Sequence, residues 1–132
     1  MPKAVNVGDK ASRTKVFTAE DVKVFADVSL DHNPIHLDAE YAKQSIFKKP
    51  VVHGMLVASL FSGILGMDLP GEGTIAMNLS VAFKRPVFVG DEVTATVEIA
   101  AVREDKPIVS VKVYATNAAG EIVIEGEGTV RV

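Results

Sequence analysis

The second half of the chain alternates between apolar and polar residues. Over 93–99 the residues Val, Ala, Val and Ile occupy every second position, and over 109–115 the residues Val, Val, Val and Ala do the same. Because successive side chains of a strand point to opposite faces, this period of two indicates strands with one buried face. Further apolar stretches lie at 74–83 and 122–132. The pattern predicts an antiparallel meander of about four strands.

A different pattern occupies 55–65, where no residue is charged. A helix that is apolar on every face lies either in a protein core or in a membrane. This run is too short, and too often interrupted by Ser and Gly, to span a bilayer. We therefore expect a buried helix that the sheet must wrap, which is an α+β architecture.

The first half predicts two covering helices. Thr18 followed by Asp21 resembles a capping box, with Asp in place of the usual Glu or Gln, and predicts a helix at 19–28. A second helix is expected at 39–46, with Asp38 as its cap. Its inward residues are predicted to be Tyr41, Ala42 and Ile46. The loop between the two helices is therefore braced on both sides.

That loop contains the most informative chemistry of the chain. Asp31 and His36 lie five residues apart around Asn33-Pro34. Because Asn-Pro favours a turn, the carboxylate and the imidazole can converge on one point. Such a pair can move protons at neutral pH. The alternative is that Asp31 bonds only its own turn and that His36 is structural.

A second motif precedes the apolar helix, where the sequence reads Pro-Val-Val-His-Gly-Met at 50–55. The free N–H groups at the start of a helix attract negative charge. Because Gly54 has no side chain, a substrate oxygen can come close to its backbone. The alternative is that Gly54 only lets the chain turn. His53, beside it, is predicted to be structural.

Composition limits the classes of function. The 132 residues are 48% hydrophobic, enough for the core of a single domain spanning 1–132. The net charge is −3 and no basic run occurs, which argues against nucleic acid as a partner. Without cysteine, a thiol nucleophile and cysteine-ligated zinc are excluded. No apolar signal segment is found over 1–10, so we expect a cytoplasmic protein with no membrane association.

Three motifs together resemble a known family. Asp-x-Asn-Pro-Ile-His at 31–36, Val-His-Gly-Met at 52–55 and Phe-Lys-Arg-Pro-Val-Phe-Val-Gly-Asp-Glu-Val at 83–93 occur in this order. The chain is similar to the MaoC-like, (R)-specific enoyl-CoA hydratases of the hydratase 2 family. The resemblance implies the hot-dog fold, in which an antiparallel sheet wraps a central buried helix. It also implies a homodimer with two sites.

The activity that this resemblance implies is syn addition of water across a trans-2-enoyl thioester of CoA. Asp31 and His36 would hold the water and transfer its protons, in an order that the sequence leaves open. The Gly54 N–H would stabilise charge on the thioester oxygen. CoA is part of the substrate, and neither a metal nor a redox cofactor is expected. Supply of monomers for polyhydroxyalkanoate synthesis is the pathway that the resemblance suggests.

Four further residues are assigned to the surroundings of the site. Asn33 is expected to make the turn, although it could position the water. Ser62 bonds either Asp31 or the carbonyl four residues before it, with equal support for both. Leu30 stands where the family commonly has a small residue, often Gly, and is expected to narrow the entrance. Leu65 is the candidate floor of an acyl tunnel, so short enoyl chains are expected.

Two other functions could use the same fold, a thioesterase and a non-catalytic binding module. A hot-dog thioesterase usually needs a carboxylate on or near the central helix, and the run from Met55 to Gly66 has none. A non-catalytic acyl-CoA or acyl-carrier binding module would be expected to have lost Asp31 or His36, and both are present. The sequence therefore favours the hydratase.

Overall fold

A five-stranded antiparallel sheet forms the body of the molecule, and the computed structural model describes residues 4–132. The strands are β1 (Lys10–Val16), β2 (Ile75–Phe83), β3 (Glu92–Val102), β4 (Ile108–Asn117) and β5 (Ile122–Arg131). Their order across the sheet is β1-β3-β4-β5-β2. The four strands expected from the sequence are confirmed. Strand β1 was not predicted, because its mostly polar residues occupy an edge of the sheet and most of them are exposed.

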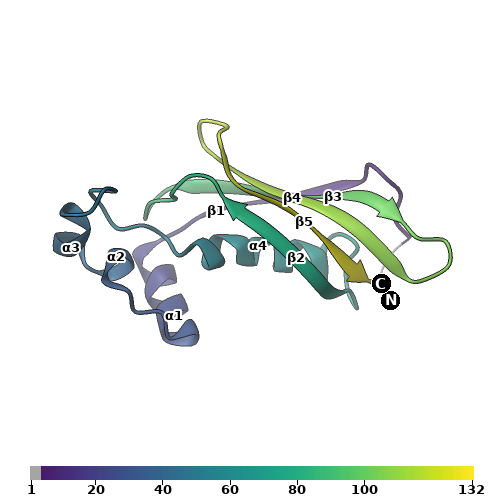
Figure 1. Ribbon diagram of the computed structural model, residues 1–132, viewed down its shortest axis with the longest axis horizontal. Coiled ribbons are helices and arrows are strands. Elements are labelled where there is room, and N and C mark those ends of the chain that lie inside the picture. The colour runs from purple at the N-terminus through teal and green to yellow at the C-terminus, as the bar shows by residue number, and fades with distance from the viewer. Residues whose placement is uncertain (1–3) are drawn as a thin grey trace.

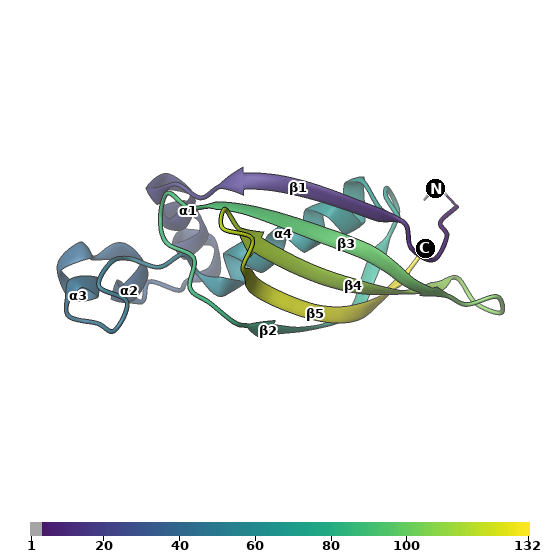
Figure 2. The same ribbon diagram turned by 90° about the horizontal axis from the view of Figure 1, so that it is seen from above.

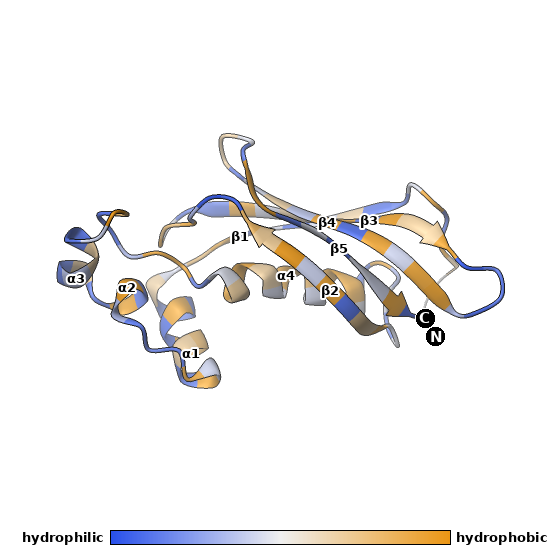
Figure 3. Cartoon of the chain, viewed as in Figure 1, coloured by the Kyte–Doolittle hydropathy of each residue, from blue (hydrophilic) through white to orange (hydrophobic). Residues whose placement is uncertain are grey.

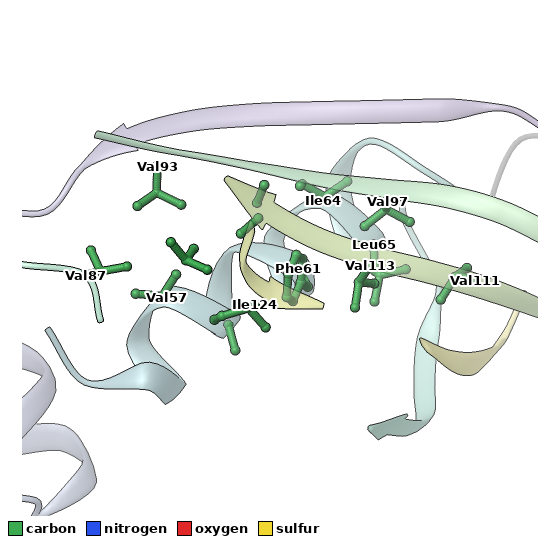
Figure 4. Packing of buried hydrophobic residues seen from close by; sticks show 14 of the residues in the cluster. Val57, Phe61, Ile64, Leu65, Val87, Val93, Val97, Val111, Val113 and Ile124 are labelled. Atoms are coloured by element: carbon green, nitrogen blue, oxygen red, sulfur yellow. The ribbon is translucent and has the colours of Figure 1, made fainter. Parts of the chain in front are cut away.

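The central helix α4 (Gly54–Met67) packs along one face of the sheet, as Figures 1 and 2 show. Its buried residues are Val57, Ala58, Phe61, Ile64 and Leu65. They meet the apolar positions of β3, β4 and β5 in one core, which Figure 4 shows from close by. The hot-dog arrangement of a sheet around a helix is therefore confirmed.

One face of α4 is open, contrary to the expectation of a helix buried on every side. Met55, Ser62 and Met67 are exposed on this helix, although Figure 3 shows that its colour is mostly hydrophobic. The sheet covers only the opposite side of the helix. None of the helices described over 4–132 has both the length and the apolar character needed to cross a bilayer.

Three shorter helices lie beyond the N-terminal end of α4, at the left of Figure 1. They are α1 (Ala19–Ser29), α2 (Pro34–Leu37) and α3 (Ala39–Lys43). The capping box of α1 is confirmed, because Thr18 and Asp21 bond each other's backbone N–H reciprocally. The segment 1–10, in which the sequence shows no apolar signal segment, includes residues 1–3, which lie outside the described part.

The prediction for the second covering helix was partly wrong. Helix α3 ends at Lys43 rather than at 46. Ala42 is buried as expected, but Tyr41 is exposed and Ile46 is 87% exposed. This segment projects beyond the end of the sheet, as Figure 2 shows, and α3 packs beside α2 rather than on the sheet. Asp38 does cap α3, accepting bonds from the N–H groups of Glu40 and Tyr41.

Candidate active site

The loop that carries the catalytic candidates contains a helical turn that the sequence analysis missed. Asn33 caps α2 by accepting a bond from the N–H of Ile35 at 3.2 Å, and Pro34 is the first helical residue. Proline at that position follows a common helix-start pattern, which was the signal available in the sequence. The expected turn role of Asn33 is confirmed. Asp31 Oδ1 also accepts a bond from the N–H of Asn33, at 3.2 Å.

Asp31 and His36 face each other across a short gap. His36 Nε2 lies 3.9 Å from Asp31 Oδ2. His36 Nδ1 lies 2.7 Å from the carbonyl oxygen of Val51, which can only accept a bond, so Nδ1 carries a proton. In neutral His36 the lone pair is then on Nε2, the atom that faces Asp31. The Asp31 side chain is 49% exposed and that of His36 12% exposed.

Gly54 is the first residue of α4, so its N–H has no acceptor within the helix. Together with His36 it lines a cavity of about 470 Å³. The apolar walls of this cavity include Val57, Val87 and Ile124, whereas Lys84 and Arg85 stand among its polar groups. An oxyanion beside Gly54 would thus lie in the same cavity as the imidazole that faces Asp31.

The ring of Phe83 packs closely against Gly54. A Cβ atom added there would stand 2.6 Å from Cε1 of Phe83. That separation is shorter than real Cβ contacts, so the phenyl ring of Phe83 packs directly over the start of α4. The lack of a Cβ atom at Gly54 therefore permits this close approach of the Phe83 ring, in addition to letting the chain turn.

His53, which the sequence predicted to be structural, contacts both members of the Asp31–His36 pair. Its ring stacks on that of His36, with centroids 3.8 Å apart and planes inclined by 26°. The two residues are 17 positions apart, and nothing in their spacing indicates a contact. Only the presence of a histidine where a helix cap would favour Ser, Thr, Asp or Asn could have drawn attention to it.

Asp31, His36 and His53 each offer one ligand atom within 4.8 Å of the others. Two histidines and a carboxylate form a familiar ligand set for transition metals. However, the lone pair of an imidazole nitrogen lies in its ring plane. Two nearly parallel stacked rings do not direct their lone pairs at a common point within coordination distance. The arrangement fits a stacked pair better than a metal centre.

The remaining candidate residues, Ser62, Leu30 and Leu65, do not line the cavity beside Gly54. Ser62 is exposed on α4, and within residues 4–132 it makes neither of the two hydrogen bonds considered from the sequence. Leu30 is 80% exposed and ends α1 in the left-handed conformation, with φ of 68°. Leu65 is 3% exposed. Figure 4 shows it among the core residues. Neither leucine lines the cavity beside Gly54.

Two other charged pairs lie outside the gap between Asp31 and His36. Arg13 holds Asp68, the C-terminal cap of α4, through two hydrogen bonds of 2.6 and 2.7 Å. These bonds, and the positive charge, hold the pKa of Asp68 below its ordinary value. His32 lies at the surface beside Asp27, 3.0 Å away, as expected for a residue facing solvent.

Comparison with known proteins identifies relatives along the whole chain. A family model described as "MaoC like domain" matches residues 3–120. An (R)-specific enoyl-CoA hydratase from Aeromonas caviae is 50% identical over 129 residues, which are 98% of this chain and 96% of the relative. One from Rhodospirillum rubrum is 43% identical and covers 97% of this chain and 88% of its own. The solved structure of the A. caviae (R)-hydratase involved in PHA biosynthesis gives a TM-score of 0.96 at 49% identity, over 98% of both chains.

Proposed function

Because the chain belongs to the family of MaoC-like domains, we propose that it catalyses (R)-specific hydration of short-chain trans-2-enoyl-CoA to (R)-3-hydroxyacyl-CoA, and the reverse dehydration. The observation that carries the proposal is the gap of 3.9 Å between His36 Nε2 and Asp31 Oδ2. The two acceptors are too far apart for a direct hydrogen bond, and one water oxygen can reach both. Gly54 lies on the wall of the same cavity as His36.

The proposed reaction balances with these groups alone. The water oxygen forms a bond to the β-carbon of the enoyl thioester, while one of its protons passes to His36 or Asp31. The electron pair of the double bond moves toward the thioester oxygen, where the Gly54 N–H donates a hydrogen bond. A proton then returns to the α-carbon. Since an imidazole can both accept and donate a proton near neutral pH, His36 is suited to either transfer.

The bond between His36 Nδ1 and the Val51 carbonyl supports this role. It commits one nitrogen of the ring to donation and leaves Nε2 to accept from water. It also fixes the orientation of the ring, so that little reorganisation is needed at the moment of reaction. Asp31 keeps Oδ2 available, because only Oδ1 is used by the turn.

The apolar cavity beside Gly54 suits an acyl chain of modest length. The A. caviae relative is described as involved in PHA biosynthesis. We propose that this protein likewise supplies (R)-3-hydroxyacyl-CoA monomers for polyhydroxyalkanoate synthesis. Dehydration in another acyl-CoA route would use the same site.

The first experiment separates hydration from the two rival functions. The purified protein is mixed with crotonyl-CoA, and the loss of the enoyl absorbance is followed together with the release of free thiol. Hydration removes the absorbance without releasing thiol, and the product is the (R) enantiomer of 3-hydroxybutyryl-CoA. Thiol release would support a thioesterase, and binding without any reaction would support a non-catalytic module.

A homodimer is also part of the proposal. Strand β2 is an edge of the sheet and is hydrogen-bonded to β5 on one side only. Its residues Ile75, Met77 and Phe83 are exposed, as are Met55 and Met67 of α4. An unpaired edge next to exposed apolar side chains is typical of a surface that pairs with another chain. Two copies joined along β2 would carry two sites, each with its own Asp31, His36 and Gly54.

Light scattering tests this assembly. At micromolar concentration the protein should have twice the mass of one chain. Met77→Glu should weaken the dimer, because it places a charge at the proposed interface. Val28→Glu, an exposed position on α1, serves as the control and should leave the dimer intact. A wild-type monomer with full activity would contradict the proposal.

A further inference from the structure

His53 occupies the N-cap of α4 but does not cap the helix. Its side chain makes no capping hydrogen bond, although this is the position where Ser, Thr, Asp and Asn normally satisfy the free N–H groups. The side chain is instead turned into the protein, and the residue is only 2% exposed. Its interactions therefore need an explanation other than helix capping.

The polar contact of His53 is with the backbone of Asp31. His53 Nε2 lies 3.0 Å from the carbonyl oxygen of Asp31, which can only accept a hydrogen bond. Nε2 therefore carries a proton. The ring thus fixes the backbone of the residue whose carboxylate faces His36.

The apolar contacts of His53 are with two other rings. One face stacks on His36 at 3.8 Å between centroids. Phe25 of α1 approaches at 4.8 Å with planes inclined by 62°, an edge-on packing that supports the imidazole from a second direction. His36 is in turn tied to the carbonyl of Val51, two residues before His53. The segment 51–53 therefore contacts both members of the Asp31–His36 pair.

This arrangement leaves one polar atom without a partner. Nδ1 of His53 is buried, and no hydrogen-bond partner exists for it in the part of the chain that the structure describes. Burying such an atom costs free energy that an apolar ring of similar shape would avoid. Phenylalanine could supply the stacking and glutamine could supply an N–H donor, but histidine supplies both. The unpaired nitrogen is the expected cost of combining them.

We infer that His53 is a positioning residue for the hydration reaction, holding Asp31 through its N–H and His36 through its ring face. The inference rests on the proposed function of the Asp31–His36 pair. Because His53 acts through the pair, its loss should slow the chemical step more than it weakens substrate binding. A displacement of about 1 Å in a catalytic group can cost about a hundredfold in rate.

Three substitutions separate the two contacts. His53→Phe keeps the ring and removes the N–H donor, His53→Gln keeps a donor and removes the ring, and His53→Leu removes both. We expect kcat for crotonyl-CoA to fall about tenfold to a hundredfold in the first two and further in the third. KM should stay within about twofold of wild type, since His53 makes no substrate contact in this scheme. His32→Gln changes a half-exposed histidine on the same loop that points toward Asp27, so it is the matched control and should keep normal kcat.

Thermal unfolding distinguishes positioning from a purely structural role. His53→Phe removes the unpaired buried nitrogen and also the N–H donor to the Asp31 carbonyl, two changes that oppose each other, so its melting temperature should stay near that of wild type while its kcat is lower. A purely structural histidine would lose activity and stability together. The inference is overturned by kcat near wild type in any folded His53 variant. It is also overturned if the lower activity of the variants is explained by a higher KM alone or by a smaller folded fraction alone.

Nitrogen NMR of the imidazoles tests the inference without catalysis. In the free wild-type protein, the bond to Val51 should hold His36 in the Nδ1–H form, and in His53→Leu the two tautomers should mix. If the wild-type protein fails to hydrate crotonyl-CoA, the proposed function fails, whereas the spectra still decide whether His53 orients His36. Unchanged His36 spectra in a folded His53→Leu variant would overturn the positioning role.

Discussion

Nε2 of His36 stands 3.9 Å from Oδ2 of Asp31, which is close enough for one water to bridge them and too far for a direct bond. The gap predicts that both groups are needed. Asp31→Asn removes the carboxylate charge and His36→Ala removes the imidazole, and each should lower kcat by at least about a hundredfold. Circular dichroism should show an intact fold in both. Near-normal hydration by either folded variant would contradict the proposed mechanism.

The close packing of Gly54 against Phe83 predicts an effect of the smallest possible side chain. In Gly54→Ala the new methyl group must displace the Phe83 ring, which is half exposed and able to move. The protein should therefore fold, but the methyl group and the displaced ring would narrow the cavity beside the backbone N–H that is proposed to bind the thioester oxygen. We expect kcat/KM for crotonyl-CoA to fall about a hundredfold.

The double variant Gly54→Ala, Phe83→Leu provides the control for this effect. Leucine makes room for the methyl group, so thermal stability lost in the single variant should return. Activity should remain low, because the approach to the N–H is still obstructed. If activity returns with stability, the loss came from the displaced phenyl ring and the oxyanion role of Gly54 loses its support.

The sequence predicted those parts of the molecule that depend on local pattern. The run of uncharged residues predicted α4, and the period of two predicted β3 and β4, because burial of one face leaves a regular trace in the sequence. The closeness of Asp31 and His36 followed from the Asn-Pro turn between them. These relationships involve few residues and short separations.

Features that depend on the tertiary arrangement were missed. Strand β1 has no apolar stripe, since it lies at the edge of the sheet and is stabilised by pairing with β3. Ile46 looked like an inward residue, but the segment that carries it extends beyond the sheet. The stack of His53 on His36 joins α2 to the start of α4. Nothing in the sequence around either histidine indicates this contact.

Acyl-chain selectivity tests the proposed role of Leu65. The cavity beside Gly54 reaches Val57 of α4, and Leu65 lies two turns further along the helix. If the tail follows α4, Leu65→Ala should shift the ratio of kcat/KM for octenoyl-CoA over crotonyl-CoA toward the longer chain. It should also cost about 2–5 kcal/mol of stability, because the side chain is buried.

Ile64→Ala is the matched control for this measurement. Ile64 is equally buried and adjacent on the helix, but it points in a different direction, about 100° away around the axis. It should lower stability by a similar amount without changing the ratio. An unchanged ratio in Leu65→Ala would assign Leu65 to the core alone. Equal shifts in both variants would indicate a general loosening of the core.

The backbone of Leu30 predicts a substitution that stabilises the protein. Its φ of 68° and ψ of 14° are left-handed values, which cost a residue with a Cβ atom about 1–2 kcal/mol. Leu30→Gly relieves this strain, while the greater freedom of glycine in the unfolded chain offsets part of the gain. With the leucine side chain 80% exposed, little burial is lost.

We expect a net increase of about 0.5–1 kcal/mol in the free energy of unfolding of Leu30→Gly, measured with urea. Leu30→Ala keeps the Cβ atom and should show no increase. The ratio of kcat/KM for octenoyl-CoA over crotonyl-CoA also tests whether Leu30 narrows the entrance. If it does, the ratio should be higher in Leu30→Gly than in wild type. A destabilised glycine variant would contradict the strain argument.

The pairing of Arg13 with Asp68 predicts how part of the stability depends on pH. Asp68 caps the C-terminal end of α4, where a negative charge is unfavourable unless it is paired. The hydrogen bonds from Arg13, with a smaller contribution from its charge, lower the pKa of Asp68 below 3.8. A lowered pKa stabilises the fold at pH values above the unfolded pKa, and this stabilisation is lost as the pH falls through the folded pKa.

Asp68→Asn should therefore have a lower melting temperature than wild type at pH 7, and the difference should vanish in acid as Asp68 becomes protonated in the wild type. Asp105→Asn is the control, because Asp105 forms a similar two-bond pair with Arg103 but lies only two residues from it in a turn. It should change the melting temperature little at any pH, since that pair joins no separate elements. The melting temperature of Asp68→Asn could instead stay below that of wild type by the same amount in strong acid. In that case the ionised pair between Arg13 and Asp68 would not be the source of the difference.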